Sequence, residues 1–272
     1  PGPLMNLQWN PDLSCQTLRS GDTSSAFFGS DACGTFVSYG GVVYGPSVAA
    51  GFSTGATNYE NVSQTPISGN GSAAAPYTVD TVVRVDGKFT LTQQDRYVVG
   101  DERWVTTMTL TNLGAPQSEV WIYRGGDCYQ ANSDSGFGKV VGTTPQCVSR
   151  GGRIQALEPI TSGNTYIEGS YSQAWAAIGS GGDLPNTVRD DPEDEHDNGV
   201  SIGWKRELPA GGSVTVESAW FLSSPFVAFA PQRILDTRPL PERTVDGISQ
   251  GEGAFTDGQT YELQVGGRAG VS

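Results

Sequence analysis

The fold is decided by residues 78–93, which read Thr78-Val-Asp-Thr-Val-Val-Arg-Val-Asp-Gly-Lys-Phe-Thr-Leu-Thr-Gln93. Two runs rich in β-branched residues flank the dipeptide Asp86-Gly87, whose residues readily adopt the left-handed backbone conformation that a tight hairpin requires. This pattern predicts two antiparallel strands joined by a two-residue turn. Strand-like runs and short polar turns continue to alternate after it, so the hairpin indicates the class of the whole domain.

The runs that follow predict a large antiparallel β-domain. In residues 104–111 (Trp-Val-Thr-Thr-Met-Thr-Leu-Thr) every second side chain shares a face, so that one face is mainly apolar and the other mainly hydroxylated. That alternation is typical of a half-buried strand. No segment shows sustained helical periodicity with caps. Further strands are predicted at residues 119–123, 165–169, 172–178, 199–207 and 213–222.

We therefore expect an all-β chain, a large two-sheet antiparallel sandwich with a short C-terminal β appendage. The 37 glycines and 16 prolines among 272 residues also favour many turns and few long helices. The six tryptophans mostly lie in strand-like runs, and we interpret them as core residues. A domain boundary is predicted near residues 223–225, because Ser-Ser-Pro follows the last strand-like run.

The charge of the chain argues against two classes of partner. Its formal net charge is −13, and its few lysines and its arginines are scattered along the sequence. A nucleic-acid-binding surface needs clustered basic residues, so we expect no nucleic-acid partner. No apolar run approaches the roughly 20 residues that span a bilayer, so we expect no membrane insertion.

The four cysteines fall into two pairs that are close in sequence, Cys15 with Cys33 and Cys128 with Cys147. Neither pair has the Cys-x-x-Cys spacing of zinc sites and redox motifs. Two local disulfides are the simplest interpretation, and four reduced buried thiols are the alternative. Disulfides form in oxidising compartments, so we predict an extracellular or cell-surface protein.

Residues 190–197 place six carboxylates in eight positions. Oxygen-rich loops bind Ca²⁺, which makes Ca²⁺ the one candidate cofactor. The spacing differs from an EF-hand loop because Pro192 interrupts it, and a solvated charged loop is the simpler interpretation. A metal site in this loop would use Asp190, Asp191, Asp194 and Asp197.

The chain has a single histidine, His196, which lies between Glu195 and Asp197. A catalytic triad that depends on histidine would have to use this residue. Its two acidic neighbours favour a protonated, exposed side chain over a general base. A zinc site built from several histidines is excluded.

Aromatic rings and polar side chains gather in residues 123–137, around one of the predicted disulfides. Rings stack on the apolar faces of sugars, and carboxylates and amides bind sugar hydroxyls. The same residues also suit an Asp/Asn/Gly-rich turn held by a disulfide, which is the simpler interpretation. The candidate ligand-binding residues are Tyr123, Asp127, Tyr129, Asn132, Asp134 and Phe137.

Two parts of the chain resemble known protein families. Residues 231–239 (Pro-Gln-Arg-Ile-Leu-Asp-Thr-Arg-Pro) and 265–271 (Val-Gly-Gly-Arg-Ala-Gly-Val) resemble a module of secreted and surface proteins of actinobacteria. More strands follow in that family, so the resemblance implies that residues 226–272 are the truncated start of a C-terminal β module, with further modules of the same polypeptide beyond it. Residues 1–5 (Pro-Gly-Pro-Leu-Met) are interpreted as a tag remnant.

Residues 6–225 are expected to form the sandwich domain. They resemble a large β-sandwich that precedes such modules in actinobacterial surface proteins, and their strand pattern is similar to the galactose-mutarotase-like supersandwich. That likeness concerns the fold and brings no catalytic residue to this chain. The matching segments are residues 32–36, 123–129, 133–138, 168–171 and 197–199.

These observations predict a surface-displayed binding or adhesion module without catalysis. A polysaccharide or cell-surface glycan is the ligand that the candidate residues favour. A carbohydrate-active enzyme, either a glycoside hydrolase or a mutarotase-like protein, is the first alternative. It would use acids near Asp127, Asp134 and residues 190–197. A structural spacer domain is the second alternative.

Overall fold

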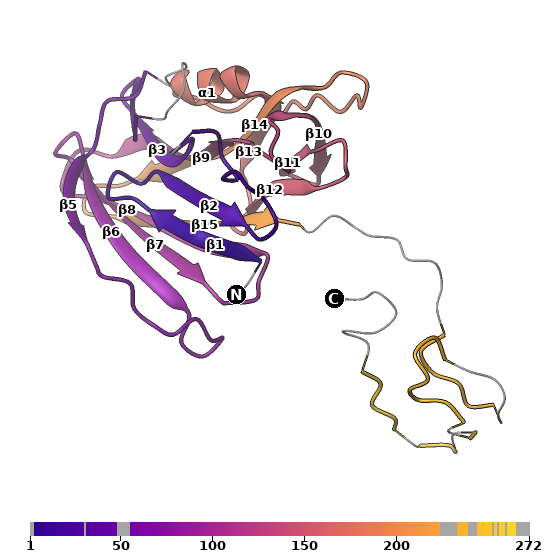
Figure 1. Cartoon of the computed structure of the whole chain (residues 1–272). Helices are drawn as coiled ribbons and strands as arrows, with labels where there is room; N and C mark the ends of the chain where they lie inside the picture. Colours follow the sequence, from indigo (N-terminus) through magenta and orange to yellow (C-terminus); the bar gives the residue numbers. More distant parts are fainter. Residues whose placement is uncertain are drawn as a thin grey trace. The chain divides into compact units, whose positions relative to one another are not determined.

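Antiparallel strand pairing organises the chain, as the computed structural model shows (Figure 1). The structure describes residues 3–29, 31–47, 55–223, 233–238, 244–251, 253–254, 256–258 and 260–264. Contacts divide the chain into two compact units, Pro1–Pro225 and Phe226–Ser272, which are described separately. The first unit confirms the predicted large antiparallel sandwich.

The elements of the first unit are strands, apart from one helix, among the residues described. The strands are β1 (Leu4–Trp9), β2 (Cys15–Arg19), β3 (Cys33–Tyr39), β4 (Val42–Tyr44), β5 (Glu60–Gln64), β6 (Tyr77–Val85), β7 (Phe89–Tyr97), β8 (Arg103–Asn112), β9 (Ser118–Asp127), β10 (Ser135–Val141), β11 (Thr144–Val148), β12 (Ile154–Pro159), β13 (Thr165–Ser170), β14 (His196–Leu208) and β15 (Ser213–Leu222), and the helix is α1 (Tyr171–Gly179).

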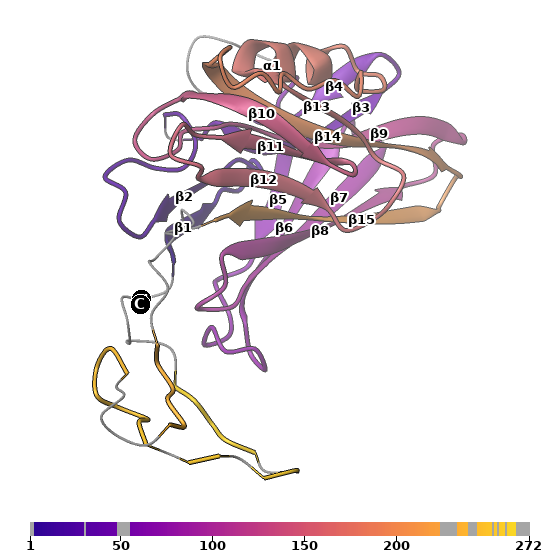
Figure 2. The ribbon, with the colours of Figure 1, turned by 90° about the vertical axis from the view of Figure 1, so that its right-hand side faces the viewer.

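Strands β3–β15 form one continuous sheet that folds over on itself. We call β4, β3, β9, β14 and β13 the inner half-sheet, and β10, β11, β12, β15, β8, β7, β6 and β5 the outer half-sheet. A short pairing between β10 and β14 joins the two halves. Helix α1 packs on β9, β13 and β14, so the inner half-sheet lies between the helix and the outer half-sheet (Figure 2).

Because they are covered on both sides, the central strands β9 and β14 of the inner half-sheet are buried on both faces along much of their length. In β9 every residue from Ile122 to Asp127 is buried, and so is every residue of β14 from Asn198 to Trp204. Gly126 allows one close approach: a Cβ atom there would lie 2.8 Å from the rings of Phe27 and Trp220. The sequences of strands buried on both faces are continuous runs of apolar and small residues, without a clear alternation of polar and apolar side chains.

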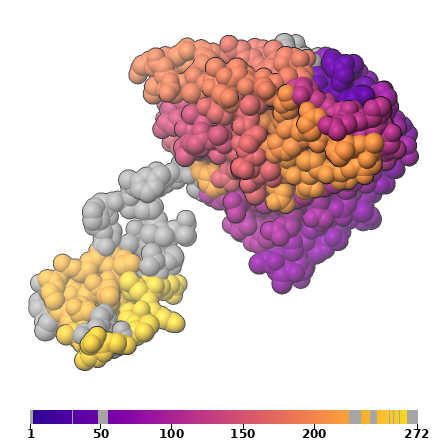
Figure 3. Space-filling model, turned by 180° about the vertical axis from the view of Figure 1, so that it is seen from behind, coloured from indigo at the N-terminus to yellow at the C-terminus, as the bar shows by residue number. Residues whose placement is uncertain are grey.

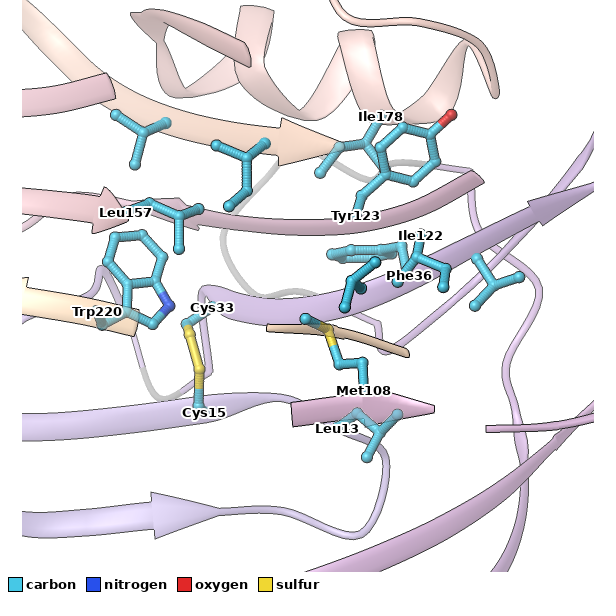
Figure 4. Packing of buried hydrophobic residues seen from close by; sticks show 14 of the residues in the cluster. Leu13, Cys15, Cys33, Phe36, Met108, Ile122, Tyr123, Leu157, Ile178 and Trp220 are labelled. Atoms are coloured by element: carbon cyan, nitrogen blue, oxygen red, sulfur yellow. A yellow bond between two sulfur atoms is a disulfide. The ribbon is translucent and has the colours of Figure 1, made fainter. Parts of the chain in front are cut away.

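Large aromatic side chains fill the space between the layers. Trp104, Trp175, Trp204 and Trp220 are fully buried, as the sequence predicted. Trp9 and Trp121 are only partly buried. Figure 4 shows part of this packing around Trp220, Met108, Phe36 and the Cys15–Cys33 disulfide.

The hairpin that predicted the fold is confirmed. Strands β6 and β7 pair from Val85–Phe89 to Tyr77–Tyr97, so the turn contains three residues, Asp86–Lys88, one more than predicted. Asp86 and Gly87 have positive φ angles of 52° and 63°. Along β8 alternate residues are buried, as the sequence pattern indicated. Both predicted disulfides, Cys15–Cys33 and Cys128–Cys147, are present.

The strand predicted at residues 172–178 is wrong, because this segment forms helix α1. Ser170 begins the helix with a capping box: its side chain accepts from the Gln173 N–H, and the Gln173 side chain accepts from the Ser170 N–H. The run then presents Ala174, Trp175 and Ile178 to the inner half-sheet. The Ser-x-x-Gln signal and the alanines, which favour helix, were the cues for this element.

The first residues described and the second unit both contain segments that the sequence analysis singled out. Leu4 and Met5, in the range interpreted as a tag remnant, belong to β1, where Leu4 is buried opposite Arg19. In the second unit the Arg238 side chain donates two hydrogen bonds of 3.0 Å to Asp236, and an isolated bridge joins Asp236 to Gln250. Residues 231–232, 239 and 265–271 of the family motif lie outside the described residues.

A chain of hydrogen bonds crosses the core between the half-sheets. Arg124 Nη1 donates to Thr35 Oγ1 over 2.8 Å, and Thr35 Oγ1 donates to Gln93 Oε1 over 2.5 Å. Gln93 Nε2 then donates to Asp95 Oδ2 over 2.7 Å, and Thr106 Oγ1 donates to Asp95 Oδ1 over 2.6 Å. All five residues are at most 2% exposed. The network therefore ties β3 and β9 to β7 and β8.

We expect Arg124→Met to lower the free energy of unfolding by about 3–5 kcal/mol, because it leaves the buried Asp95 carboxyl without its compensating charge. Urea denaturation followed by tryptophan fluorescence measures the loss. The double variant Arg124→Met/Asp95→Asn is the matched control, and it should recover part of the stability because no buried charge remains. A loss below about 1 kcal/mol for Arg124→Met would contradict this role.

Candidate functional site

An apolar hollow of about 440 Å³ opens between β1 and the neighbouring ends of β6 and β7. This volume lies in the range of about 300–1,000 Å³ that small-molecule sites occupy. Among the described residues its lining contains no Asp, Glu or His, so it offers contacts for binding and no general acid or base. We call it the aromatic hollow, and it is lined by Leu4, Asn6, Leu7, Trp9, Ile67, Tyr77, Tyr97 and Val99.

A bulge in β1 aims side chains into the aromatic hollow. The pairing of β1 with β2 shifts register between Met5 and Gln8, and Asn6 has a positive φ of 51°. Asparagine tolerates this conformation better than most residues, and a bulge turns the side chains that follow it. Leu7 and Trp9 can therefore both line the same hollow.

Two tyrosines from the hairpin form another wall of the aromatic hollow. Tyr77 and Tyr97 lie directly opposite each other in the β6–β7 pairing. Tyr97 is buried, and its hydroxyl donates to the Leu4 carbonyl over 3.4 Å, whereas Tyr77 is partly exposed. Ile67 and Val99 stand at the rim with 64% and 46% of their surface exposed. The hollow is thus preformed and open to solvent.

Three carboxyl groups lie close enough to repel one another at the C-terminal end of β9. We call Asp127, Asp134 and Asp197 the acid cluster. Asp127 pairs with Gly199 of β14, which places it diagonally from Asp197 on the same face of the sheet. Asp134 precedes Ser135, the residue opposite Asp197. Asp127 is 2% exposed, and neither its Oδ1 atom nor that of Asp197 has a hydrogen-bond partner.

Burial and mutual repulsion raise the pKa values in the acid cluster. Burial first, and then repulsion from Asp197 and Asp134, raise the pKa of Asp127 to about 8. Burial and repulsion from Asp134 raise the pKa of Asp197 to about 6. At neutral pH Asp127 therefore keeps its proton while Asp197 is mostly ionised, which is the division found between an acid and a base in many active sites.

His196 differs from its sequence-based prediction, because its side chain is only 8% exposed. Its Nε2 lies 3.3 Å from Glu168 Oε1, and its Nδ1 lies 2.9 Å from the Asp194 carbonyl oxygen. Burial alone would lower the pKa of His196, but these two partners outweigh it and raise that pKa. The Glu168 carboxylate fits there because Gly138 has no side chain: a Cβ atom would overlap Glu168 Oε2.

The four predicted calcium ligands are not brought together. Asp190 and Asp191 are exposed, and the Asp194 carboxylate is paired with Arg189 over 2.5 Å. Asp197 belongs to the acid cluster. Across the described part of the chain, no three His, Cys, Asp or Glu side chains form a group that could hold a metal ion.

The predicted sugar-binding residues do not form one exposed surface, because two of them are buried. Tyr123 is fully buried, and its hydroxyl donates to the Gly182 carbonyl over 2.7 Å, so it presents no ring to a ligand. The reason is that β9 is covered on both faces. Asp127 is buried as well, in the acid cluster with Asp134.

The remaining three predicted residues have different neighbours. Asn132 Oδ1 accepts hydrogen bonds from the N–H groups of Thr23 and Ser24, as in the simpler turn interpretation. The Tyr129 ring packs 5.9 Å from that of Phe28. Phe137 is partly buried, and the Lys139 ammonium lies 5.8 Å from its ring centre.

Sequence reasoning did not find the aromatic hollow. The hairpin pattern did not supply the signal, because a two-residue turn at Asp86-Gly87 would place Tyr77 opposite Arg96, whereas the observed three-residue turn places it opposite Tyr97. The contribution of β1 had no signal either, since a bulge and its pairing with β2 are not local features of residues 4–9.

No protein-family model and no curated protein sequence matches the chain. A mutant of heparan sulfate lyase HepC from Pedobacter heparinus is similar in structure, with a TM-score of 0.46 and 8% identity over 84% of this chain and 33% of that one. The chain thus spans about a third of the lyase. A protein assigned as an aldose 1-epimerase from Escherichia coli K12 gives a TM-score of 0.36 and 11% identity over 82% and 96%. Similarities this distant support no inference about ligand or activity.

The raised pKa of Asp127 predicts how stability depends on pH. Its folded pKa is about 8 against an ordinary value of 3.8, so the folded state holds a proton that the unfolded state releases. The stability that this proton contributes is present below about pH 4 and is lost as the pH rises toward 8. We expect Asp127→Asn to remove this loss, a difference of roughly 3–4 kcal/mol between pH 5 and pH 8.5.

Urea denaturation of both proteins at the two pH values measures this difference. Asp190→Asn is the matched control, because Asp190 is an exposed carboxylate outside the acid cluster. An equal change of stability with pH in the wild type and in Asp127→Asn would contradict the assignment.

Proposed function

We propose that this chain is an extracellular carbohydrate-binding module and that a sugar binds in the aromatic hollow. The observation that carries the proposal is the convergence of Trp9, Tyr77 and Tyr97 on one preformed, open hollow. Two disulfides support an extracellular location. Among the described residues no helix has the length and apolar character needed to cross a membrane.

The chemistry of the hollow suits a sugar ring. Sugars have an apolar C–H face and a polar edge, and aromatic rings pack on the former. The exposed amide of Asn6 can both donate to and accept from hydroxyl groups at the edge. Tyr97 is fixed by burial and by its hydrogen bond to Leu4, so little side-chain entropy is lost on binding. A hollow of this size holds one or two sugar rings.

The proposed display on a cell surface, with a role in adhesion, rests on other residues. It comes from the resemblance of residues 231–239 to a module of actinobacterial surface proteins. Asp236 and Arg238 of that motif form an ion pair, which gives the motif a scaffolding role. The ligand-binding part of the proposal does not depend on this resemblance.

We expect Trp9→Ala to weaken the binding of a soluble oligosaccharide by at least about tenfold, because a stacked ring together with its buried area contributes about 1.4 kcal/mol or more. Titration calorimetry against a panel of soluble mono- and disaccharides measures it. Tyr77→Ala, at the open side of the hollow, should act in the same direction with less effect on folding.

Trp121→Ala is the matched control, because Trp121 is a partly exposed tryptophan on β9, outside the hollow. Circular dichroism checks the fold of each variant. Saccharide binding that is unchanged in Trp9→Ala and Tyr77→Ala would refute the hollow as the site, and a panel without any ligand would remove the proposal.

The acid cluster favours a second candidate, a carbohydrate-active enzyme. A protonated Asp127 beside an ionised Asp197 is the pairing that general acid–base catalysis on a glycosidic bond requires. The near-complete burial of Asp127 weighs against this candidate, because a substrate must reach the proton donor. The binding module is therefore the better supported of the two.

If the enzyme candidate holds, Asp127→Asn should reduce the release of reducing ends from a polysaccharide panel by 10²-fold or more. A reducing-sugar assay at pH 5–8 measures this, with Asp190→Asn as control. No release by the wild type, or equal release by both variants, eliminates this candidate. Blank results in both the binding and the turnover assays would favour the structural spacer.

A further inference from the structure

A regular array of hydroxyl groups covers the outward side of three neighbouring strands. Along β7, β8 and β15, alternate side chains point away from the core, and those in the middle of the array are all threonine or serine. They are half-exposed or exposed. Figure 3 shows the orange residues of β15 at the surface of the molecule. We call the array the threonine face, and it comprises Thr90, Thr92, Thr109, Thr111, Ser213 and Thr215.

Strand register arranges the threonine face in two straight rows. Thr90, Thr111 and Ser213 lie opposite one another in the first row. The second row contains Thr92, Thr109 and Thr215. Neighbouring strands lie about 4.8 Å apart, and alternate residues of one strand lie about 6.7 Å apart, so the hydroxyls repeat in two dimensions.

Hydrogen bonds hold the hydroxyls of each row in place. Thr111 Oγ1 lies 2.8 Å from Ser213 Oγ, and Thr109 Oγ1 lies 2.9 Å from Thr215 Oγ1. Each pair uses one O–H donor and keeps a second donor and several lone pairs for an outside partner. Threonine is also stiff about χ1, so the face is ordered before any partner arrives.

The threonine face is neutral, whereas its border is charged. In the next row the Thr107 hydroxyl donates to Glu217 over 2.8 Å, and Gln94 donates to Asp80 over 2.9 Å. Arg84 lies beside Thr90 at one end of the first row. A neutral centre that both donates and accepts hydrogen bonds, with methyl groups between the hydroxyls, matches a partner with the same mixture of groups.

We propose that the threonine face binds the flat side of a neutral polysaccharide, whose sugar rings run across the strands along the two rows. The inference deepens the proposed carbohydrate-binding function and rests on it. Sugar hydroxyls donate and accept, so they extend the hydroxyl pairs into longer cooperative chains, while sugar C–H groups contact the threonine methyl groups. A charged glycan would leave its anionic groups without basic partners among these six residues.

The two carbohydrate sites then differ in the length of ligand that they require. The aromatic hollow takes one or two rings, whereas three strands abreast need several consecutive rings to make all their contacts. Each hydroxyl contact is weak, at about 0.5–1.5 kcal/mol, so binding at the threonine face depends on many contacts at once. Soluble short sugars and insoluble polymers therefore report on different sites.

The test is the triple variant Thr92→Val/Thr109→Val/Thr215→Val, which removes one row of hydroxyls and keeps β-branched side chains of nearly the same shape. We expect its retention on insoluble cellulose, chitin, mannan or β-glucan to fall about tenfold or more relative to the wild type. Its circular dichroism and its binding of soluble sugars in the aromatic hollow should be unchanged. Thr187→Val is the control, because Thr187 is an exposed threonine outside the face.

Equal retention of the wild type and the triple variant, or no retention of the wild type on any of these polymers, would overturn the proposal. So would freezing-point hysteresis of the wild type that the triple variant lacks, in the absence of polymer retention, since that result would assign the face to ice. Loss of soluble-sugar binding in Trp9→Ala tests the hollow alone. If no soluble sugar binds but polymer retention depends on the threonine row, the hollow fails and the threonine face stands.

Discussion

A buried positive charge holds the two halves of this sandwich in one arrangement. Arg124 lies on β9 in the middle of the fold, fully shielded from water, where burial lowers its pKa to about 10 and attraction to Asp95 opposes that shift. A charge in such a place is tolerated only when its surroundings supply hydrogen-bond partners in fixed positions. Thr35 accepts a hydrogen bond from Arg124, while Gln93 and Thr106 donate to Asp95, the carboxyl that attracts the Arg124 charge. Any shift of one half-sheet over the other would break these hydrogen bonds. The network therefore selects a single arrangement of the two half-sheets.

That arrangement determines where the carboxyl groups of the acid cluster lie. Once β9 is fixed by Arg124, its end brings Asp127 next to β14 and the start of β10. Asp127 and Asp197 belong to β9 and β14, and Asp134 immediately precedes β10. The acid cluster is built mainly on strands and does not belong to the charged loop at residues 190–194. Residues 190–194 are solvated, as the simpler interpretation predicted, whereas Asp197 lies within a strand and faces its neighbours. Neighbouring positions in the sequence thus have unlike environments, because only the later ones enter the sheet.

The same distinction explains what could be predicted from the sequence. The β6–β7 hairpin, the alternation in β8 and the two disulfides depend on residues close together in the chain, and all are confirmed. The helix at residues 171–179 had a local signal in its Ser-x-x-Gln cap, which a count of strand-like runs overlooked. The burial of Tyr123 and His196 and the formation of the aromatic hollow depend on α1, Glu168 and β1, which pack from distant parts of the sequence. Such non-local contacts leave no pattern in the segments themselves.

The hairpin that reveals the fold also contributes to both proposed carbohydrate sites. Successive side chains of a strand point to opposite faces, so β7 can present Tyr97 inward to the aromatic hollow and Thr90 and Thr92 outward to the threonine face. The aromatic hollow and the threonine face do not compete for the same positions, because each uses alternate residues of one strand. Threonine is favoured in strands for its β-branched shape, which by itself would explain single residues on a solvated face. It does not explain two uninterrupted rows across three strands that include no charge, since lysine and glutamate serve a solvated face equally well and protect it better from unwanted association. The regularity of the rows, more than their composition, is what calls for a partner with a repeating surface.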